Sequence, residues 1–197
     1  MWFFAVLIVV AFFALLSSIF ALAITRVPVV RTPVDFLQEI AGQIGALDSG
    51  VIVDAGCADG RALRELCRLT GTSGRGYELN GPVVVYAKLR ALFSRGRKGI
   101  KVKLLWRDFF RSELQDVAVL YCYLMPGVMR RVGQKSLEEM QPGTHLISYM
   151  WEVPEWIPSR KILLGRGADP LYVYELPPSV RSKEAEDAGQ KLDGPDG

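Results

Sequence analysis

The stretch that decides the fold is Val51–Arg61, which reads VIVDAGCADGR. Its first three residues are wholly apolar, as in strands that are buried inside a parallel sheet. A glycine-rich turn follows, and a helix is predicted from Arg61 to about Leu69. The inward side chains of this helix are expected to be Leu63, Leu66 and Cys67. A strand, a glycine-rich turn and a helix in this order form the generic nucleotide-binding unit, in which backbone approaches the ligand closely.

The charges in this turn indicate what kind of ligand it takes. A dinucleotide loop would read G-x-G-x-x-G, but here Gly56 and Ala58 are followed by Gly60 one residue early. Asp54 and Asp59 also lie in the turn. They would repel a pyrophosphate and suit a cationic ligand that carries an ammonium and a sulfonium. A Walker loop is excluded, because no Gly-Lys-Ser/Thr occurs. A nicotinamide dehydrogenase is therefore disfavoured.

Two further acids stand at the ends of later predicted strands. Glu78 lies 22 positions after Gly56 in the strand Gly74–Leu79, where a carboxylate can accept the hydroxyls of a ribose. Asp108 follows the strand Lys101–Trp106, where it could meet an adenine amino group. Each acid alone is more simply interpreted as a turn residue. The ordered set is much harder to obtain by accident, and it indicates one ligand site.

The rest of the chain alternates helices with strands. Thr32 is expected to cap a helix that begins near Pro33. The residues on the inner face of this helix are Leu37, Ile40, Ala41 and Ile44. The other predicted helices are Pro82–Ser94 and Val128–Glu139, and the other predicted strands are Val117–Leu124, Gly143–Met150 and Leu171–Leu176. This alternation predicts an α/β sandwich around a mostly parallel sheet with helices on both faces.

The N-terminal segment Met1–Ile24 contains no charged residue. It is long enough to cross the ~30 Å of a bilayer core, so we expect one transmembrane helix. A cleaved signal peptide is the alternative, but no basic n-region precedes the apolar stretch. Arg26 and Arg31 follow the segment, and the positive-inside rule then places the domain in the cytoplasm. The predicted parts are a transmembrane helix (1–24), one α/β domain (25–176) and a disordered polar tail (177–197).

Cysteine and histidine usage excludes two classes of protein. The cysteines are odd in number, show no CxxC spacing and suit a reducing compartment; they are Cys57, Cys67 and Cys122. A disulfide scaffold is therefore not expected. The chain has one histidine, His145, so a multi-histidine metal site is impossible and no metal is predicted. We expect His145 to be a core residue rather than a base.

Several segments, taken in order, resemble the class I, seven-stranded S-adenosylmethionine-dependent methyltransferases. They are VPVVRTP (27–33), VDAGCADGR (53–61), GYELN (76–80), Arg107-Asp108, YLMPGVM (123–129), Pro142–Ser148 and YVYEL (172–176). More narrowly, they resemble the small membrane-anchored protein-lysine methyltransferases that modify the ATP synthase c-subunit and the adenine nucleotide translocase, with their prokaryotic relatives. The resemblance covers roughly Val27–Leu176.

This resemblance implies that S-adenosylmethionine is the cofactor. It implies that the cofactor is bound by Asp54, Gly56, Gly60, Glu78, Asn80 and Asp108, with Ala58 and Asp59 in the same turn. Ala58 stands where the family usually has glycine, and a small residue there should still admit the cofactor. Replacement of Asp54 or Glu78 by alanine is expected to weaken binding.

The acceptor site is expected after the fourth and fifth predicted strands of the sheet. Methyl transfer needs alignment and desolvation, and the amine must arrive neutral, so carbonyls, hydroxyls and ring faces are suitable. We assign Tyr123, Pro126 and Trp151 to this site, and Trp156 could extend its wall. Core packing is the alternative for each aromatic residue. Leu124-Met125-Pro126-Gly127 stands where enzymes that methylate nucleobase amines carry Asp or Asn before Pro-Pro, which disfavours nucleic acid.

The predicted partners are a membrane and a protein lysine. Eight basic residues and no acid lie between Glu78 and Asp108, namely Lys88, Arg90, Arg95, Arg97, Lys98, Lys101, Lys103 and Arg107. They could face anionic headgroups or form an ordinary solvated surface. We expect a single-pass protein of the prokaryotic inner membrane or, alternatively, of the mitochondrial inner membrane, which methylates a lysine of a membrane or membrane-adjacent protein. The alternatives are a small-molecule or lipid methyltransferase and a non-catalytic Rossmann-like binding module.

Overall fold

A computed structural model of the 197-residue chain shows how these elements are arranged. It describes residues 2–25, 31–47, 49–92, 100–165, 167 and 169–180.

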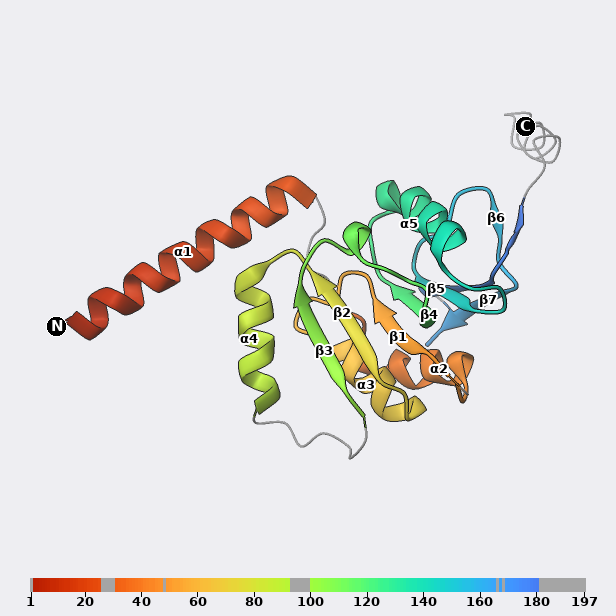
Figure 1. Ribbon diagram of the computed structural model, residues 1–197, viewed down its shortest axis with the longest axis horizontal. Helices are drawn as coiled ribbons and strands as arrows, with labels where there is room; N and C mark the ends of the chain where they lie inside the picture. Colours follow the sequence, from red (N-terminus) through yellow and green to blue (C-terminus); the bar gives the residue numbers. More distant parts are fainter. Residues whose placement is uncertain are drawn as a thin grey trace.

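Seven strands form one sheet in the order β3-β2-β1-β4-β5-β8-β7 (Figure 1). They are β1 (Val51–Asp54), β2 (Gly74–Glu78), β3 (Val102–Trp106), β4 (Val117–Cys122), β5 (His145–Tyr149), β7 (Arg160–Leu164) and β8 (Asp169–Glu175). The first five in this spatial order run parallel, and β8 and β7 are antiparallel to their neighbours. The chain order reverses between β1 and β4. Open α/β sheets bind ligands at such a switch point, beyond the carboxyl ends of the strands.

Helices cover both faces of this sheet, as predicted. α2 (Val34–Ile44), α3 (Arg61–Thr70) and α4 (Gly81–Leu92) pack on one face, and α5 (Pro126–Glu139) packs on the other. Neighbouring strand residues serve opposite faces: Ile52 belongs to the core under α2 and α3, whereas Val53 belongs to the core under α5. This division explains why the strands are apolar at nearly every position, since both of their faces are buried.

The first two helices of the domain confirm the predicted faces. α2 buries Leu37, Ile40, Ala41 and Ile44, and α3 buries Leu63, Leu66 and Cys67. The predicted cap is wrong, because Pro33 occupies the N-cap of α2 and no side chain caps the helix. The hydroxyl of Thr32 lies instead 2.6 Å from the hydroxyl of Tyr121, a residue of β4. Thr32 therefore joins α2 to the sheet.

Three strands and one short turn were not expected from the sequence. β6 (Trp156–Ile157) pairs with β9 (Ser179–Val180), β7 forms one edge of the main sheet, and residues 109–111 form a 3-10 turn. β9 falls within the segment assigned to the polar tail, and residues 181–197 lie outside the described part of the chain. β7 reads RKILL, and its charged start concealed it from a search for apolar strands.

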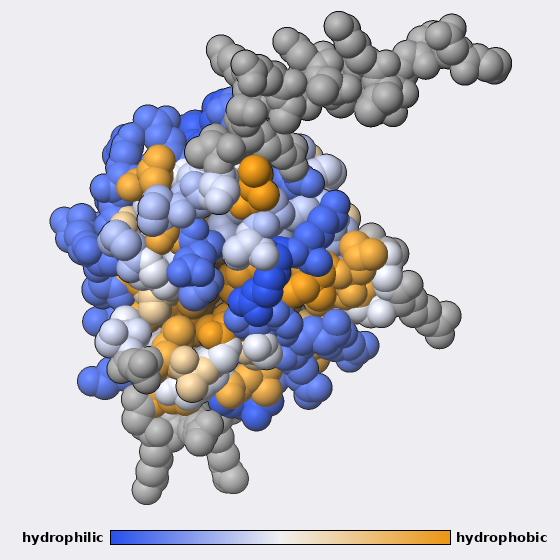
Figure 2. Space-filling view, turned by 90° about the vertical axis from the view of Figure 1, so that its right-hand side faces the viewer, coloured by the Kyte–Doolittle hydropathy of each residue, from blue (hydrophilic) through white to orange (hydrophobic). Residues whose placement is uncertain are grey.

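The face of the molecule on the β7 side is mixed in character (Figure 2). Leu163 of β7 and Ile157 of β6 are exposed hydrophobic side chains, and Arg160 and Lys161 of β7 are exposed and charged. Charged side chains on an edge strand oppose pairing with strands of other molecules. This edge is therefore protected from aggregation by the same residues that made it hard to predict.

The predicted membrane localisation is contradicted. The N-terminal helix α1 extends over Trp2–Thr25 and projects away from the sheet (Figure 1). Among the residues described, no helix has both the length and the hydropathy of a membrane span. The structure therefore gives no support for a transmembrane helix, a membrane anchor or a single-pass protein.

The predicted basic face is only partly covered by the described residues. Of the basic residues between β2 and β3, Arg95, Arg97 and Lys98 lie outside the described residues. Arg90 is directed at Asp59, with its Nη1 3.5 Å from the Asp59 Oδ2. At least one member of the predicted basic face is therefore engaged within the domain.

Candidate active site

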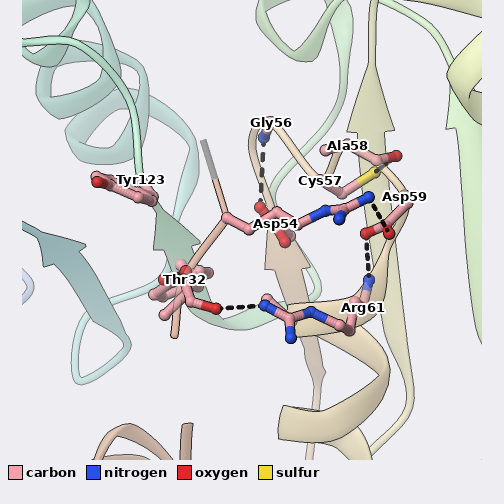
Figure 3. A pocket seen from close by; sticks show the side chains of 11 residues that line it. Thr32, Asp54, Gly56, Cys57, Ala58, Asp59, Arg61 and Tyr123 are labelled. Carbon is pink, nitrogen blue, oxygen red and sulfur yellow. Dashed lines mark hydrogen bonds and ion pairs between the residues drawn. The ribbon is translucent and has the colours of Figure 1, made fainter. Parts of the chain in front are cut away.

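A small pocket, partly open to solvent, lies at the switch point of the sheet (Figure 3). Asp54 at the end of β1 and Tyr123 just after β4 both line it. The rest of the lining comes from the turn Gly56–Asp59, the segment Arg31–Thr32, the first two residues of α3 (Arg61 and Ala62) and Tyr121 of β4. Segments distant in sequence therefore meet at the point where the topology favours a ligand.

Asp54 is the most perturbed carboxyl group of this pocket. Its side chain is buried, and its Oδ1 accepts a long hydrogen bond of 3.4 Å from the amide of Gly56. Burial raises the pKa of Asp54 to about 7; the Gly56 amide opposes this rise, and the nearby Glu78 adds to it. A buried carboxylate gains most from a cation that enters beside it. The pocket thus fits the ammonium group of an amino-acid ligand.

The glycines of the turn leave room for close approach of the backbone. A Cβ on Gly56 would lie 2.7 Å from a methyl carbon of Leu124, and Gly60, the N-cap of α3, has a left-handed φ of 68°. Ala58 also adopts a positive φ, of 46°. For a residue with a side chain this conformation costs about 1–2 kcal/mol. The position where the family usually has glycine is therefore one where glycine would be less strained.

Glu78 fastens the end of β2 to the glycine turn. Its Oε2 accepts from the amide of Ala58 at 3.0 Å, and its Oε1 accepts from the amide of Asn80 at 2.8 Å. An ionised carboxylate has about four acceptor positions, so capacity remains for two ribose hydroxyls. Glu78 lies beside the pocket and is not part of its lining. Its location at the strand end agrees with the predicted ribose role.

Asp59 lines the pocket and also makes contacts that the sequence did not predict. Its Oδ1 accepts from the amide of Arg61 at 3.2 Å, and its Oδ2 lies 3.1 Å from Arg31 and 3.5 Å from Arg90. Its side chain is only 5% exposed, whereas those of Arg31 and Arg90 are 59% and 48% exposed. Asp59 therefore pairs with two arginines at the surface of the domain, and its assignment to the cofactor remains a prediction.

The segment Arg31–Thr32 is fixed against the pocket by three contacts. Besides the Arg31–Asp59 ion pair, Nη2 of Arg61 donates to the carbonyl of Thr32 at 2.6 Å, and Thr32 meets the hydroxyl of Tyr121 (Figure 3). Sequence reasoning missed Arg31, Thr32 and Arg61 as pocket residues. The one signal for this segment in the sequence was VPVVRTP (27–33), which is part of the family pattern and includes Arg31 and Thr32.

Asn80 and Asp108 lie farther along the same edge of the sheet. Oδ1 of Asn80 accepts from the amide of Val83 in the first turn of α4, and Oδ1 of Asp108 accepts from the amide of Phe110 in the 3-10 turn. The amide of Arg107 donates to the carbonyl of Glu78, which brings the ends of β2 and β3 together. Asn80, Asp108 and Gly60 do not line the pocket. Their assignment to the cofactor remains a prediction.

The predicted acceptor residues are not brought together. Tyr123 lines the pocket, but Pro126 is the exposed first residue of α5, and Trp151 is 37% exposed beyond β5. Trp156 is buried against Tyr174, at a ring-centroid distance of 5.6 Å, and so belongs to the core. His145 begins β5 at the opposite edge of the sheet from the pocket. The core alternative therefore holds for Trp156.

Two residues beside Tyr123 were missed altogether. Tyr149, the last residue of β5, packs against Tyr123 with the two rings tilted by 59° and their centroids 4.5 Å apart, and its hydroxyl donates to Oδ2 of Asp169 at 2.6 Å. Asp169 begins β8. No signal in the sequence could reveal this pair, because the residues come from strands that are 20 positions apart and run in opposite directions.

Comparisons with known proteins agree with the fold. A family profile described as the ANTKMT methyltransferase domain matches residues 54–160. A lysine N-methyltransferase of the ATP synthase c-subunit, from Caenorhabditis elegans, is 28% identical over 64% of this chain and 65% of its own length. A protein-lysine N-methyltransferase from Saccharolobus islandicus is 23% identical over 78% of this chain and 96% of its own length. The chain thus spans just under two thirds of the nematode relative.

One solved structure has a similar fold over most of the chain. It is an RNA methyltransferase from Salinibacter ruber in complex with S-adenosyl-L-homocysteine, with a TM-score of 0.68, 24% identity, and coverage of 78% of this chain and 98% of that chain. At this identity the likeness concerns the fold alone. The family profile, in contrast, spans more than half of the chain and includes the glycine turn and β4. The chain therefore belongs to the ANTKMT methyltransferase domain family.

Proposed function

We propose that the chain is an S-adenosylmethionine-dependent protein-lysine methyltransferase. The observation that carries the proposal is the buried Asp54 beside the glycine turn, at the switch point of a methyltransferase-family domain. Both relatives described above are named as lysine N-methyltransferases. Their names support lysine as the acceptor.

The residues of the pocket, together with Glu78 beside it, fit the parts of this cofactor. Asp54 would take its ammonium group, and Glu78 would take its ribose hydroxyls through the acceptor positions that the turn amides leave. Arg31 and Arg61 line the same pocket and supply positive charge for a carboxylate. The cofactor supplies a methyl group on a sulfonium. Direct transfer to an amine demands alignment and exclusion of water, and little proton chemistry from the protein.

The test uses the full chain and two measurements. Isothermal titration with S-adenosyl-L-homocysteine measures cofactor binding. Incubation of a total cell extract with the protein and methyl-labelled S-adenosylmethionine, followed by acid hydrolysis of the protein fraction, measures transfer. We expect binding, and label recovered as methyl-lysine. An excess of S-adenosyl-L-homocysteine is the control and should abolish the label.

Each other result contradicts a stated part of the proposal. Absence of S-adenosyl-L-homocysteine binding would reject the cofactor. Label in the organic extract would favour a small-molecule or lipid methyltransferase. Binding with no label in any fraction would favour a non-catalytic Rossmann-like module.

A further inference from the structure

The carboxyl ends of β4 and β5 and the amino end of β8 place two phenols and a carboxylate next to the pocket. β4 is followed by Tyr123, β5 ends with Tyr149, and β8 begins with Asp169. β5 lies between β4 and β8 in the sheet, parallel to the first and antiparallel to the second. An antiparallel strand begins where its neighbour ends, so Asp169 reaches the edge of the sheet where the pocket lies.

The contacts within this group are direct. The Tyr123 and Tyr149 rings are 4.5 Å apart, and Tyr149 donates to Oδ2 of Asp169. Phe36 of α2 packs edge-on against Tyr149 at 6.2 Å. A Cβ on Gly165, in the turn after β7, would lie 2.6 Å from the Phe36 ring, so this turn closes over Phe36 without room to spare. Tyr149 is therefore in contact with both Tyr123 and Phe36.

Exposure divides the group into an outer and an inner part. Tyr149 is 2% exposed, whereas Tyr123 and Asp169 are partly exposed. Tyr123 also lines the pocket that holds Asp54 and Gly56. A molecule that touches Tyr123 and Asp169 would thus lie beside the pocket, and Tyr149 would lie behind both without touching it.

The chemistry of the group favours a cation. Partial burial and the nearby Asp169 raise the pKa values of Tyr123 and Tyr149, so both phenols stay neutral at physiological pH. Asp169 then supplies the one negative charge of the group. The faces of tyrosine rings attract alkylammonium groups, and a carboxylate fixed by a phenol hydroxyl is ready to pair with one. A nucleobase amine is neutral and would gain little from either feature.

We propose that Tyr123, Tyr149 and Asp169 form the acceptor subsite, and that it takes the ammonium group of a lysine side chain. This inference rests on the proposed function and deepens it. Tyr123 and Asp169 contact the amine, and Tyr149 is a positioning residue that orients Asp169. After loss of one proton from the ammonium to water, the lysine nitrogen uses its lone pair to bond the methyl carbon. The carbon–sulfur bond breaks, its electron pair stays on sulfur, and the methylated amine carries the positive charge.

The test measures methyl transfer to poly-L-lysine, with bulk transfer RNA as the competing acceptor and S-adenosyl-L-homocysteine titration as the cofactor measurement. Asp169→Asn should raise the KM for poly-L-lysine at least tenfold and change cofactor affinity less than twofold. Tyr149→Phe keeps the ring and should raise the same KM by a smaller factor. Asp169→Glu keeps the negative charge and should raise this KM less than Asp169→Asn does. The matched control is Asp116→Asn, which removes an exposed carboxylate at the amino end of β4 and should leave both quantities unchanged.

Three results would overturn the assignment. The first is an unchanged KM in Asp169→Asn, and the second is a parallel loss of cofactor affinity, which would mean a merely structural role. The third is a wild-type protein that binds cofactor but labels transfer RNA, or labels nothing, instead of poly-L-lysine. Failure of the wild-type protein to bind S-adenosyl-L-homocysteine is a separate result, since it rejects the proposed function itself.

Discussion

At the scale of single residues, Asp54 connects the stability of the domain to its function. Its carboxyl pKa is raised to about 7 in the folded protein, chiefly by burial, from an ordinary value of 3.8. The folded protein therefore holds this proton more tightly than the unfolded chain does. The contribution of Asp54 to the free energy of unfolding is therefore largest below about pH 4. It falls as the pH rises toward 7, by an amount on the order of 4 kcal/mol. At neutral pH the buried carboxyl group of the pocket therefore lowers the stability of the folded protein.

Asp54→Asn removes this dependence and the binding function together. We expect the ligand-free variant to be more stable than the wild-type protein above pH 7, with the difference shrinking toward pH 5, because only the wild-type protein must ionise a buried group. Thermal unfolding of both proteins from pH 5 to 8 measures this. A constant difference across that range would contradict the buried ionisation.

Cofactor binding should depend on pH through the same group. A cationic ligand favours the ionised carboxylate, so wild-type affinity for S-adenosyl-L-homocysteine should rise about tenfold per pH unit up to about pH 7 and then level off. Asp54→Asn should bind weakly and show no such rise. Titration calorimetry between pH 5.5 and 8 measures both proteins, and equal slopes would exclude Asp54 as the group responsible.

At the scale of elements, α5 offers a pair of glycines that separates packing from helix propensity. A Cβ on Gly133 would lie 2.5 Å from Val153 and 3.3 Å from the Trp156 ring, whereas a Cβ on Gly127 would meet nothing within 4 Å. Gly133→Ala should therefore destabilise the protein by about 1–3 kcal/mol through overpacking. Gly127→Ala should be neutral or stabilise it by up to about 1 kcal/mol. Urea unfolding midpoints measure the two changes, and similar shifts would refute the close packing of α5 on β6.

At the scale of the whole molecule, the pocket is built from segments that are distant in sequence. Arg31 and Thr32 are held by Asp59, Arg61 and Tyr121, which belong to the glycine turn, α3 and β4. A ligand that fills the pocket would contact this segment and the sheet at once. The start of α2 should therefore respond to the ligand.

Hydrogen exchange tests this coupling. Saturation with S-adenosyl-L-homocysteine should slow amide exchange in the peptide that covers residues 31–37, since the ligand would fasten Thr32 and the first turn of α2. A peptide within α5, such as residues 131–138, lies on the other face of the sheet and serves as the reference. Unchanged exchange at 31–37 in protein that binds the ligand would show that this segment does not close the pocket.

Much of the fold was predictable because it depends on patterns of residues that are close together in the sequence. The buried faces of α2 and α3 follow from helical spacing of Leu37, Ile40, Leu63 and Leu66. β1 and β4 follow from apolar runs, and the glycine turn follows from its small residues. β7 was not predictable, since an edge strand half open to water keeps charged residues and loses the apolar signal.

The sequence by itself determined the methyltransferase family and the mostly parallel sheet, and it indicated the acids Asp54 and Glu78 as candidates for the cofactor site. These features depend on residues within one turn or at the end of one strand. Only the tertiary structure decided that Asp59 pairs with arginines, that Thr32 meets Tyr121 and that Tyr149 orients Asp169. Such contacts join strands whose order in the sheet differs from their order in the chain. A one-dimensional pattern does not encode them, because sheet pairing and packing set which side chains meet.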